Sequence, residues 1–151
     1  MKNDIFIDNN VAKNFKNPID PHYKKLVEWL FEKGHLVLSQ KLLKEYHSSN
    51  RGNWGQSILT IISRLTKDER LVSISNEQME NLRFSKVTER RLTCNAEDRW
   101  HLKTILLSHR KIAVIIDVAL RNDVNNHPNH EGVKPIAVSR PEEIDYENYL
   151  L

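Results

Sequence analysis

The chain has 151 residues, a length that suits one domain, and its 39% hydrophobic and 28% charged residues are the proportions of a soluble globular protein. No apolar run approaches the roughly 20 residues that a membrane-spanning helix needs, so a membrane protein is not indicated and no membrane partner is expected. The formal net charge of +3 is compatible with a polyanionic substrate but is equally common in proteins that never bind nucleic acid.

Cys94 is the only cysteine, which excludes an intramolecular disulfide and a zinc cluster of several thiolates. The N-terminus runs directly into the apolar segment 5–7, without the basic region, the long apolar stretch and the cleavage site of a signal peptide. Both observations favour a reducing, cytoplasmic location.

The first elements predicted along the chain are a strand and a helix. Segment 5–7 is β-branched and aromatic and stops at residues that favour turns, which predicts a buried strand. Segment 22–33 repeats apolar residues at helical spacing. Asp20, followed by a proline, is a helix start signal, and Gly34 is typical of the position just after a helix.

The middle of the chain continues the alternation. Segment 36–38 predicts a second strand, and Ser39 is placed to cap the helix that follows it. A polar loop then leads to a helix predicted over 54–65 and a third strand over 71–74. Segment 75–91 is polar, and we expect a helix only in its middle.

The last third predicts a helix over 97–109 that leads into 112–116, the most apolar run of the chain. A short helix to about residue 124 and a loop rich in His and Asn precede a final strand over 136–138. The tail from about 140 is expected to be loosely ordered.

Alternation of short buried strands with helices predicts a single α/β domain over residues 1–151. Consecutive parallel strands need crossover helices, and these cover both faces of the sheet. We therefore expect a three-layer α/β/α fold with a central parallel sheet of about five strands.

Acidic residues follow the predicted strands. Asp8 ends the first strand and Asp117 ends the strand 112–116, so both should emerge at the carboxyl edge of the sheet, where open α/β folds bind ligands. Glu45 and Asp98 can reach the same edge from the helices that carry them. Taken alone, each acid is better explained as a turn residue or a solvated helical charge, and only their coincidence indicates a site.

Carboxylates crowded at one edge repel each other, and a hard cation such as Mg²⁺ or Mn²⁺ relieves that repulsion. Such a cation activates a bound water and neutralises charge on a phosphate, so hydrolysis of a phosphodiester is the natural chemistry. The sequence therefore predicts a metal site with Mg²⁺ or Mn²⁺ as the cofactor.

Two of these acids lie in longer motifs. Segment 5–7 is followed by Asp8-Asn9-Asn10, and segment 36–38 is followed by Ser39 and a helix with Glu45 just before an aromatic residue. At these residues the sequence resembles the PIN-domain family of metal-dependent nucleases. The first strand of that family typically ends in Asp-Thr-Asn, so Asn9 replaces the threonine.

The other two acids match later motifs of the same family. Asp98 with His101 three residues later resembles the third motif of one branch. In that branch an acid closes the fourth strand and another follows six residues later, as Asp117 and Asp123 do here. Asp117 is the match for the fourth acid, and Asp123 is its fallback. The four matches occur in the family's order and cover nearly the whole chain.

The resemblance implies an endoribonuclease that hydrolyses RNA through a metal-activated water. The expected metal-binding and catalytic residues are Asp8, Glu45, Asp98 and Asp117, and the supporting residues are Asn10, Ser39 and His101. Many stand-alone members of the family are toxins that a small antitoxin inhibits. A role in a toxin-antitoxin or defence system, an antitoxin partner and a homodimer are therefore further expectations.

Two other functions stay open on the sequence alone. Asn9 favours a PIN-like RNA- or protein-binding module that has lost efficient hydrolysis, whereas the presence of all four acids favours the enzyme. A flavodoxin-like or receiver domain also places acids at strand ends, but the chain has neither the paired acids after the first strand nor the lysine near the last strand that such a domain requires.

Overall fold

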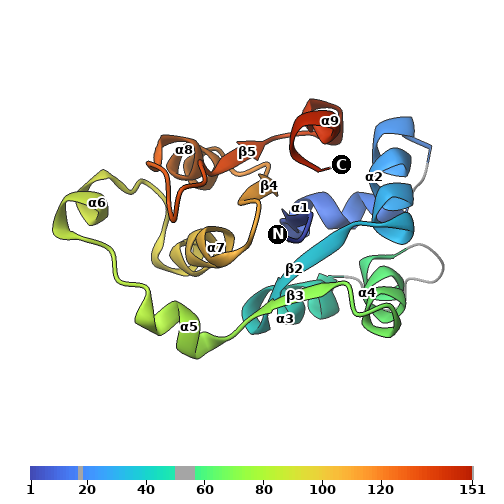
Figure 1. Cartoon of the computed structure of the whole chain (residues 1–151), viewed down its shortest axis with the longest axis horizontal. Coiled ribbons are helices and arrows are strands. Elements are labelled where there is room, and N and C mark those ends of the chain that lie inside the picture. Colours follow the sequence, from blue (N-terminus) through green and yellow to red (C-terminus); the bar gives the residue numbers. More distant parts are fainter. Residues whose placement is uncertain (17–18, 50–56, 151) are drawn as a thin grey trace.

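The computed structural model describes residues 1–16, 19–49 and 57–150, and in it a central sheet is flanked by helices on both sides (Figure 1). The five strands pair in the order β3-β2-β1-β4-β5, and every neighbouring pair is parallel. This confirms the predicted three-layer α/β/α fold with a parallel sheet. The strands are β1 (Asp4–Ile7), β2 (His35–Ser39), β3 (Leu71–Ile74), β4 (Ile112–Val114) and β5 (Ile136–Val138).

Helices connect these strands. The longer helices α2 and α4 lie on one side of the sheet, and α7 and α8 lie on the other (Figure 1). In chain order the helices are α1 (Asn9–Ala12), η1 (Lys13–Lys16), α2 (Pro21–Glu32), α3 (Gln40–Ser49), α4 (Ile58–Lys67), α5 (Asn76–Asn81), α6 (Lys86–Arg91), α7 (Ala96–Leu107), α8 (Val118–Asn126), η2 (Pro141–Glu143) and α9 (Tyr146–Tyr149).

Helix α2 begins and ends within one residue of the predicted bounds. The glycine that follows it is needed for space and not for a positive φ. Asp20 accepts a hydrogen bond from the backbone N–H of His22 at 2.8 Å. The N–H of Gly34 donates to the carbonyl of Trp29 at 2.9 Å. A Cβ atom at Gly34 would lie 2.4 Å from the Trp29 ring, so this position needs glycine for space. Only Gly132 has a positive φ among the described glycines.

Several predicted segments have other bounds in the structure, or lie partly outside the described residues. Helix α4 begins at Ile58, with Ser57 as its cap, and the predicted start at residue 54 lies outside the described residues. Segment 75–91 contains two short helices, α5 and α6, each opened by a serine cap. Strand β4 ends at Val114, before the predicted end at residue 116, and beyond it the carbonyls of Ile115 and Ile116 accept from the Arg121 guanidinium, at 3.2 and 2.9 Å.

The order in which strands are added to the sheet reverses between β1 and β4. From β1 the chain adds β2 and β3 on one side, then returns to place β4 and β5 on the other side. Ligands of open α/β sheets bind at such a switch point, beyond the carboxyl ends of the strands. Asp8 lies there, and its N–H donates to the carbonyl of Val114 at 3.0 Å.

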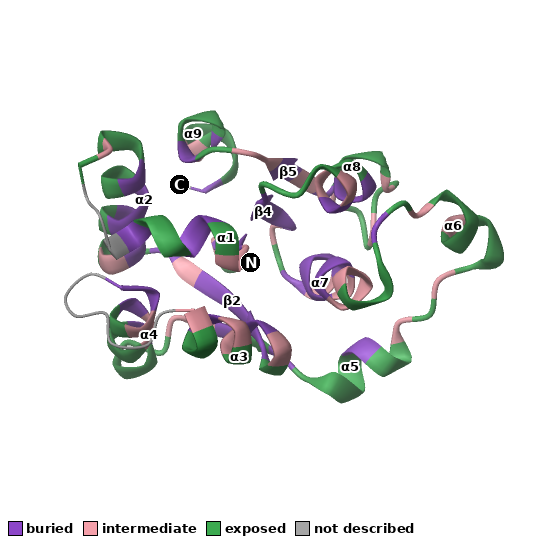
Figure 2. Ribbon diagram, turned by 180° about the vertical axis from the view of Figure 1, so that it is seen from behind, coloured by how far each residue is buried: buried purple, intermediate pink, exposed green. Residues whose placement is uncertain are grey.

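The sheet forms the buried centre of the molecule, as the purple strands in Figure 2 show. By contrast, α6 has no buried residue and lies at the edge of the molecule, away from the strands (Figure 2). At the C-terminus, where the tail was expected to be loosely ordered, η2 and α9 are formed and Leu150 is fully buried. Within the described residues, no helix is long and apolar enough to span a membrane.

Candidate functional site

Asp8 occupies the N-cap position of α1, directly after β1. Its backbone is extended, but its carboxylate makes no capping hydrogen bond to the helix. The side chain is half-buried, and this desolvation raises the pKa of Asp8 above its ordinary value. The charges of Glu45 and Asp98 raise it further, while the charge of His101 and a backbone N–H bond lower it. Asp8 is thus a carboxylate with little local compensation.

Glu45 lies on α3 and is held by a buried histidine. The two carboxylate oxygens lie 3.2 and 2.9 Å from Nε2 of His101, and Lys41 is 4.0 Å away on the same helix. Desolvation by itself would raise the pKa of Glu45, but the hydrogen bond and charge of His101, with Lys41, outweigh it and lower the pKa. Glu45 therefore stays ionised more readily than a glutamate in water.

His101 comes from α7 and is only 1% exposed. Its ring packs edge-on against Phe6 of β1, with 5.4 Å between the ring centroids. The imidazole therefore joins α7 to both β1 and α3, and it orients the carboxylate of Glu45. This contact is consistent with the supporting role that the sequence suggested for His101.

Asp98 lies in the first turn of α7, where Asn95 caps the helix by accepting from the N–H of Asp98 at 2.8 Å. Desolvation raises the pKa of Asp98, and His101 opposes that rise. The charges of Asp117 and Glu45 raise the pKa further. The pKa of Asp98 is thus raised by carboxylates that belong to two other elements.

Asp117 is exposed and caps α8 by accepting from the N–H of Leu120 at 2.9 Å. One of its oxygens is therefore already used by the helix. Its charge still acts on Asp98 across the switch point.

The structure thus brings each of the four predicted acids into electrostatic range of at least one other near the carboxyl edge of the sheet. The charges of Glu45 and Asp98 act on Asp8, and the charge of Asp117 acts on Asp98. We call Asp8, Glu45, Asp98 and Asp117 the carboxylate cluster.

The fallback acid, Asp123, is placed differently. It is 5% exposed and accepts hydrogen bonds from the N–H and the hydroxyl of Thr93 and from the N–H of Cys94, at 2.8 to 2.9 Å. Desolvation raises the pKa of Asp123, but these bonds outweigh it and lower the pKa. Burial, together with Asp123, raises the pKa of the Cys94 thiol to about 12. Asp123 therefore anchors the segment that enters α7.

The donor chemistry of the carboxylate cluster fits a hard cation, because all its ligand atoms are carboxylate oxygens. The positions of the side chains fit a cation less well than their chemistry does. In the described part of the chain, no three His, Cys, Asp or Glu residues form a group that could hold a metal ion. The cluster is therefore an acidic site whose carboxylates would have to move closer together to coordinate one cation.

The other predicted supporting residues have local roles. Ser39 caps α3 by accepting from the N–H of Leu42 at 3.1 Å. Asn10 is exposed, and its side-chain oxygen lies 3.4 Å from Nζ of Lys13. Asn9 donates from Nδ2 to the hydroxyl of Ser49 at 2.7 Å, which fixes α1 against α3.

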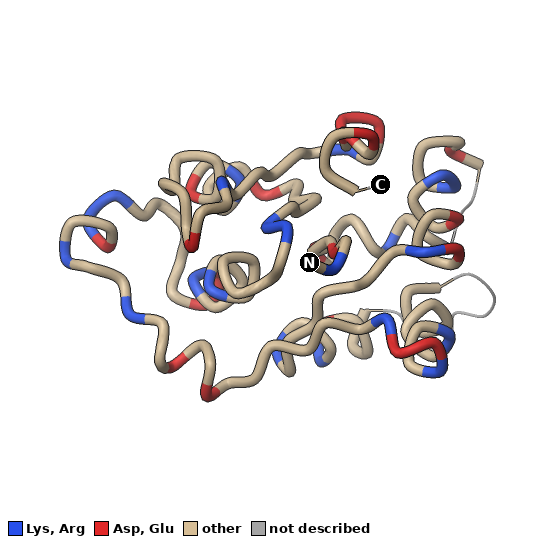
Figure 3. The backbone as a smooth tube through the Cα atoms, in the orientation of Figure 1, with Lys and Arg blue, Asp and Glu red and all other residues tan. Residues whose placement is uncertain are grey.

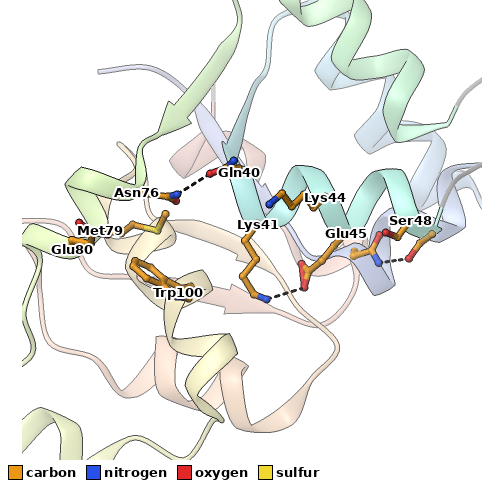
Figure 4. A pocket seen from close by; sticks show the side chains of 11 residues that line it. Gln40, Lys41, Lys44, Glu45, Ser48, Asn76, Met79, Glu80 and Trp100 are labelled. Atoms are coloured by element: carbon orange, nitrogen blue, oxygen red, sulfur yellow. Dashed lines mark hydrogen bonds and ion pairs between the residues drawn. The ribbon is translucent and has the colours of Figure 1, made fainter.

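A cavity beside the carboxylate cluster was not predicted from the sequence. It has a volume of about 530 Å³, and side chains of α3, α5 and α7 line it, including Lys41, Lys44, Met79 and Trp100 (Figure 4). Trp100 lies in the helix predicted over 97–109, and that pattern does not mark it as a cavity residue. Only the packing of α5 against α7 brings the indole to this cavity, and no sequence signal marks that contact.

The basic residues of segment 83–91 are exposed and lie on or beside α6, at the far end of the molecule from α2 (Figure 3). The loop histidines His127 and His130 pack ring to ring, with 6.2 Å between the centroids. Neither group adjoins the carboxylate cluster in sequence or through a hydrogen bond within the described residues.

Comparison with protein-family models, with curated proteins and with solved structures finds no match for this chain. The resemblance to the PIN-domain family therefore depends on the four short motifs and their order along the chain.

Proposed function

We propose that this chain is a PIN-like, divalent-metal-dependent endoribonuclease in which the carboxylate cluster binds Mg²⁺ or Mn²⁺. The observation that carries the proposal is that acids of four different elements adjoin one another near the topological switch point of the sheet. There, the charges of Glu45 and Asp98 add to the raised pKa of Asp8, and the charges of Asp117 and Glu45 add to that of Asp98. Repulsion of this kind destabilises the folded protein unless a bound cation relieves it. Four acids that match one family's motifs in order support the same function.

Asp8 is the best candidate for the central ligand. Its carboxylate is half-buried, makes no capping hydrogen bond, and lies where β1 and β4 diverge. When bound, a divalent cation would supply an activated water and neutralise charge on the phosphate. The residues Asp8, Asp98 and Asp117 would hold it, together with Glu45.

The chain's own residues prepare Glu45 for that task. His101 and Lys41 lower the pKa of Glu45, so its carboxylate is ionised before a cation arrives. Because His101 is buried against Phe6, the orientation of Glu45 is set by the core.

The second candidate is a PIN-like module that binds RNA or protein but hydrolyses RNA weakly. Two observations favour it. Asn9 replaces the threonine of the family motif and is engaged by Ser49, and the described residues contain no ready group of three metal ligands. An antitoxin partner, a homodimer and a role as a toxin stay predictions of the resemblance.

The test is RNA cleavage by the purified protein with Mn²⁺ and with EDTA. The wild type is compared with Asp8→Asn and Asp117→Asn. Asp145→Asn is the matched control, because Asp145 also caps a helix but lies at the C-terminus. Cleavage should require Mn²⁺, fail in both cluster variants and persist in the control. Metal-dependent cleavage that survives both cluster substitutions would refute the assignment.

A further inference from the structure

The cavity between α3, α5 and α7 adjoins the carboxylate cluster at Glu45. Glu45 belongs to the cluster and also lines the cavity, and Asn9, another lining residue, directly follows Asp8. Its volume of about 530 Å³ is within the roughly 300–1,000 Å³ of sites for small ligands. A chemical group held in this cavity would therefore lie next to the carboxylates.

One wall of the cavity is an indole ring. Trp100 is partly buried and also lines a second cavity, together with Lys103. The Lys103 ammonium is 5.3 Å from the indole ring centroid and does not line the first cavity. The indole surface toward the first cavity is thus not covered by that lysine, and the side chain of Met79 lies beside it (Figure 4).

The rest of the lining is polar and includes amides, lysines and carboxylates of α3 and α5, namely Gln40, Lys41, Lys44, Glu45, Asn76 and Glu80. Nδ2 of Asn76 donates to Oε1 of Gln40 at 2.8 Å. The side-chain NH₂ group of Gln40 can then donate to a ligand, and the side-chain carbonyl of Asn76 can accept from one. Lys41 lies 4.0 Å from Glu45 and 3.8 Å from Glu97, so carboxylates already engage it. Lys44 is exposed on the same helix and adds a second cation to the cavity lining.

We infer that this cavity binds one nucleotide of single-stranded RNA, with the base stacked on Trp100 and a backbone phosphate at Lys44. The inference rests on the proposed function, since it places that nucleotide beside the phosphodiester to be hydrolysed. An aromatic surface with a neighbouring donor, acceptor and cation is the chemistry that recognises an unstacked base and its phosphate. A base inside a duplex cannot present its face to an indole, so the cavity selects unpaired RNA.

The test is fluorescence anisotropy of a labelled eight-nucleotide single-stranded RNA in EDTA at low salt, where metal-dependent cleavage does not occur. Trp100→Leu should weaken binding roughly 5- to 150-fold, the effect of losing one base-aromatic stack. Trp100→Phe keeps an aromatic surface and should restore most of the affinity. Lys44→Ala should reduce the slope of log affinity against log salt by about 0.7, because one phosphate contact is lost.

Lys67→Ala is the matched control, since Lys67 is an exposed lysine near the end of α4 and lines none of the cavities described here. Lys44 is exposed too, so its variant tests the inference even if Trp100→Leu does not fold. Equal binding by wild type, Lys44→Ala and Lys67→Ala overturns the inference, whether or not RNA is cleaved with Mn²⁺. Losses specific to Trp100 and Lys44 without any cleavage support the inference and overturn the proposed nuclease activity alone.

Discussion

Asp4 and Asp8 stand at the two ends of β1, yet the fold treats their carboxylates in opposite ways. Asp4 is fully buried, and its two oxygens accept from the backbone N–H groups of His109 and Arg110 at 2.9 and 2.8 Å. Asp8 is half-buried, makes no capping hydrogen bond, and has a raised pKa. A buried acid with donors around it holds the fold together, whereas one that faces other acids costs stability and is open to a ligand.

The same contrast separates Asp123 from Asp98. Asp123 receives its hydrogen bonds from Thr93 and Cys94, and its pKa falls. Asp98 faces Asp117 and Glu45, and its pKa rises. The lesson is that hydrogen-bond satisfaction, more than burial or position in a motif, distinguishes a structural carboxylate from a candidate ligand in this chain.

The largest expected effect is the loss of activity in Asp8→Asn. If Asp8 is a central metal ligand, RNA cleavage with Mn²⁺ should fall by roughly 100- to 1,000-fold, as when one charge-stabilising group is removed from an active site. The rate is measured under single-turnover conditions beside Asp145→Asn. A wild-type rate in Asp8→Asn would place Asp8 in the same structural class as Asp4.

The next largest effect is on the stability of the fold and concerns Asp4, at the other end of β1. Asp4→Asn should lower the free energy of unfolding by about 2–3 kcal/mol, because one backbone N–H loses a charged acceptor and faces an amide N–H instead. Urea denaturation measures this loss. A change below about 0.5 kcal/mol, the usual range for surface substitutions, would show that the hydrogen bonds of Asp4 do not support the fold.

Metal binding should act only at the carboxylate cluster. Mn²⁺ at ten times its dissociation constant should stabilise the wild type by about 1.4 kcal/mol, which is a rise of roughly 3–6 °C in Tm for a chain of this size. Thermal denaturation with and without Mn²⁺ measures the rise. Asp8→Asn should lose most of it and Asp4→Asn should keep it, and an equal response in all three proteins would contradict a site at the cluster.

The smallest effect concerns the pH dependence of stability at Asp8. The pKa of Asp8 is raised above its ordinary value of 3.8, so the folded protein binds that proton more tightly than the unfolded chain does. The free energy of unfolding therefore falls as pH rises from 3.8 through the raised pKa. Asp8→Asn removes this loss and should be more stable than the wild type at pH 7, by about 0.5–1 kcal/mol.

The stability difference between Asp8→Asn and wild type should thus grow as pH rises from below 3.8 toward neutrality. Urea denaturation at several pH values without divalent metal measures it. Asp4→Asn is expected to be less stable than the wild type in the same measurement, because a backbone N–H loses its charged acceptor. A difference that shrinks with rising pH would mean that the Asp8 carboxylate is stabilised in the folded protein.

The sequence by itself determined the local elements of this protein. Short apolar runs and helical apolar patterns, together with caps such as Asp20 and Ser39, depend on neighbours a few residues apart. Most strands and helices were therefore predictable to within a few residues. Acids placed directly after strands, such as Asp8 and Asp117, were predictable because parallel strands share one carboxyl edge.

The tertiary structure decided which carboxylates are satisfied. The donors to Asp4 are more than 100 residues away along the chain, His101 meets Glu45 across 56 positions, and the donors to Asp123 come from another element. Trp100 became a cavity wall only when α5 packed beside α7. Such contacts depend on how distant segments pack, and no local pattern of residues encodes them. The chain's acids were visible in its sequence, but only the fold showed which of them are satisfied by hydrogen bonds and which face other acids.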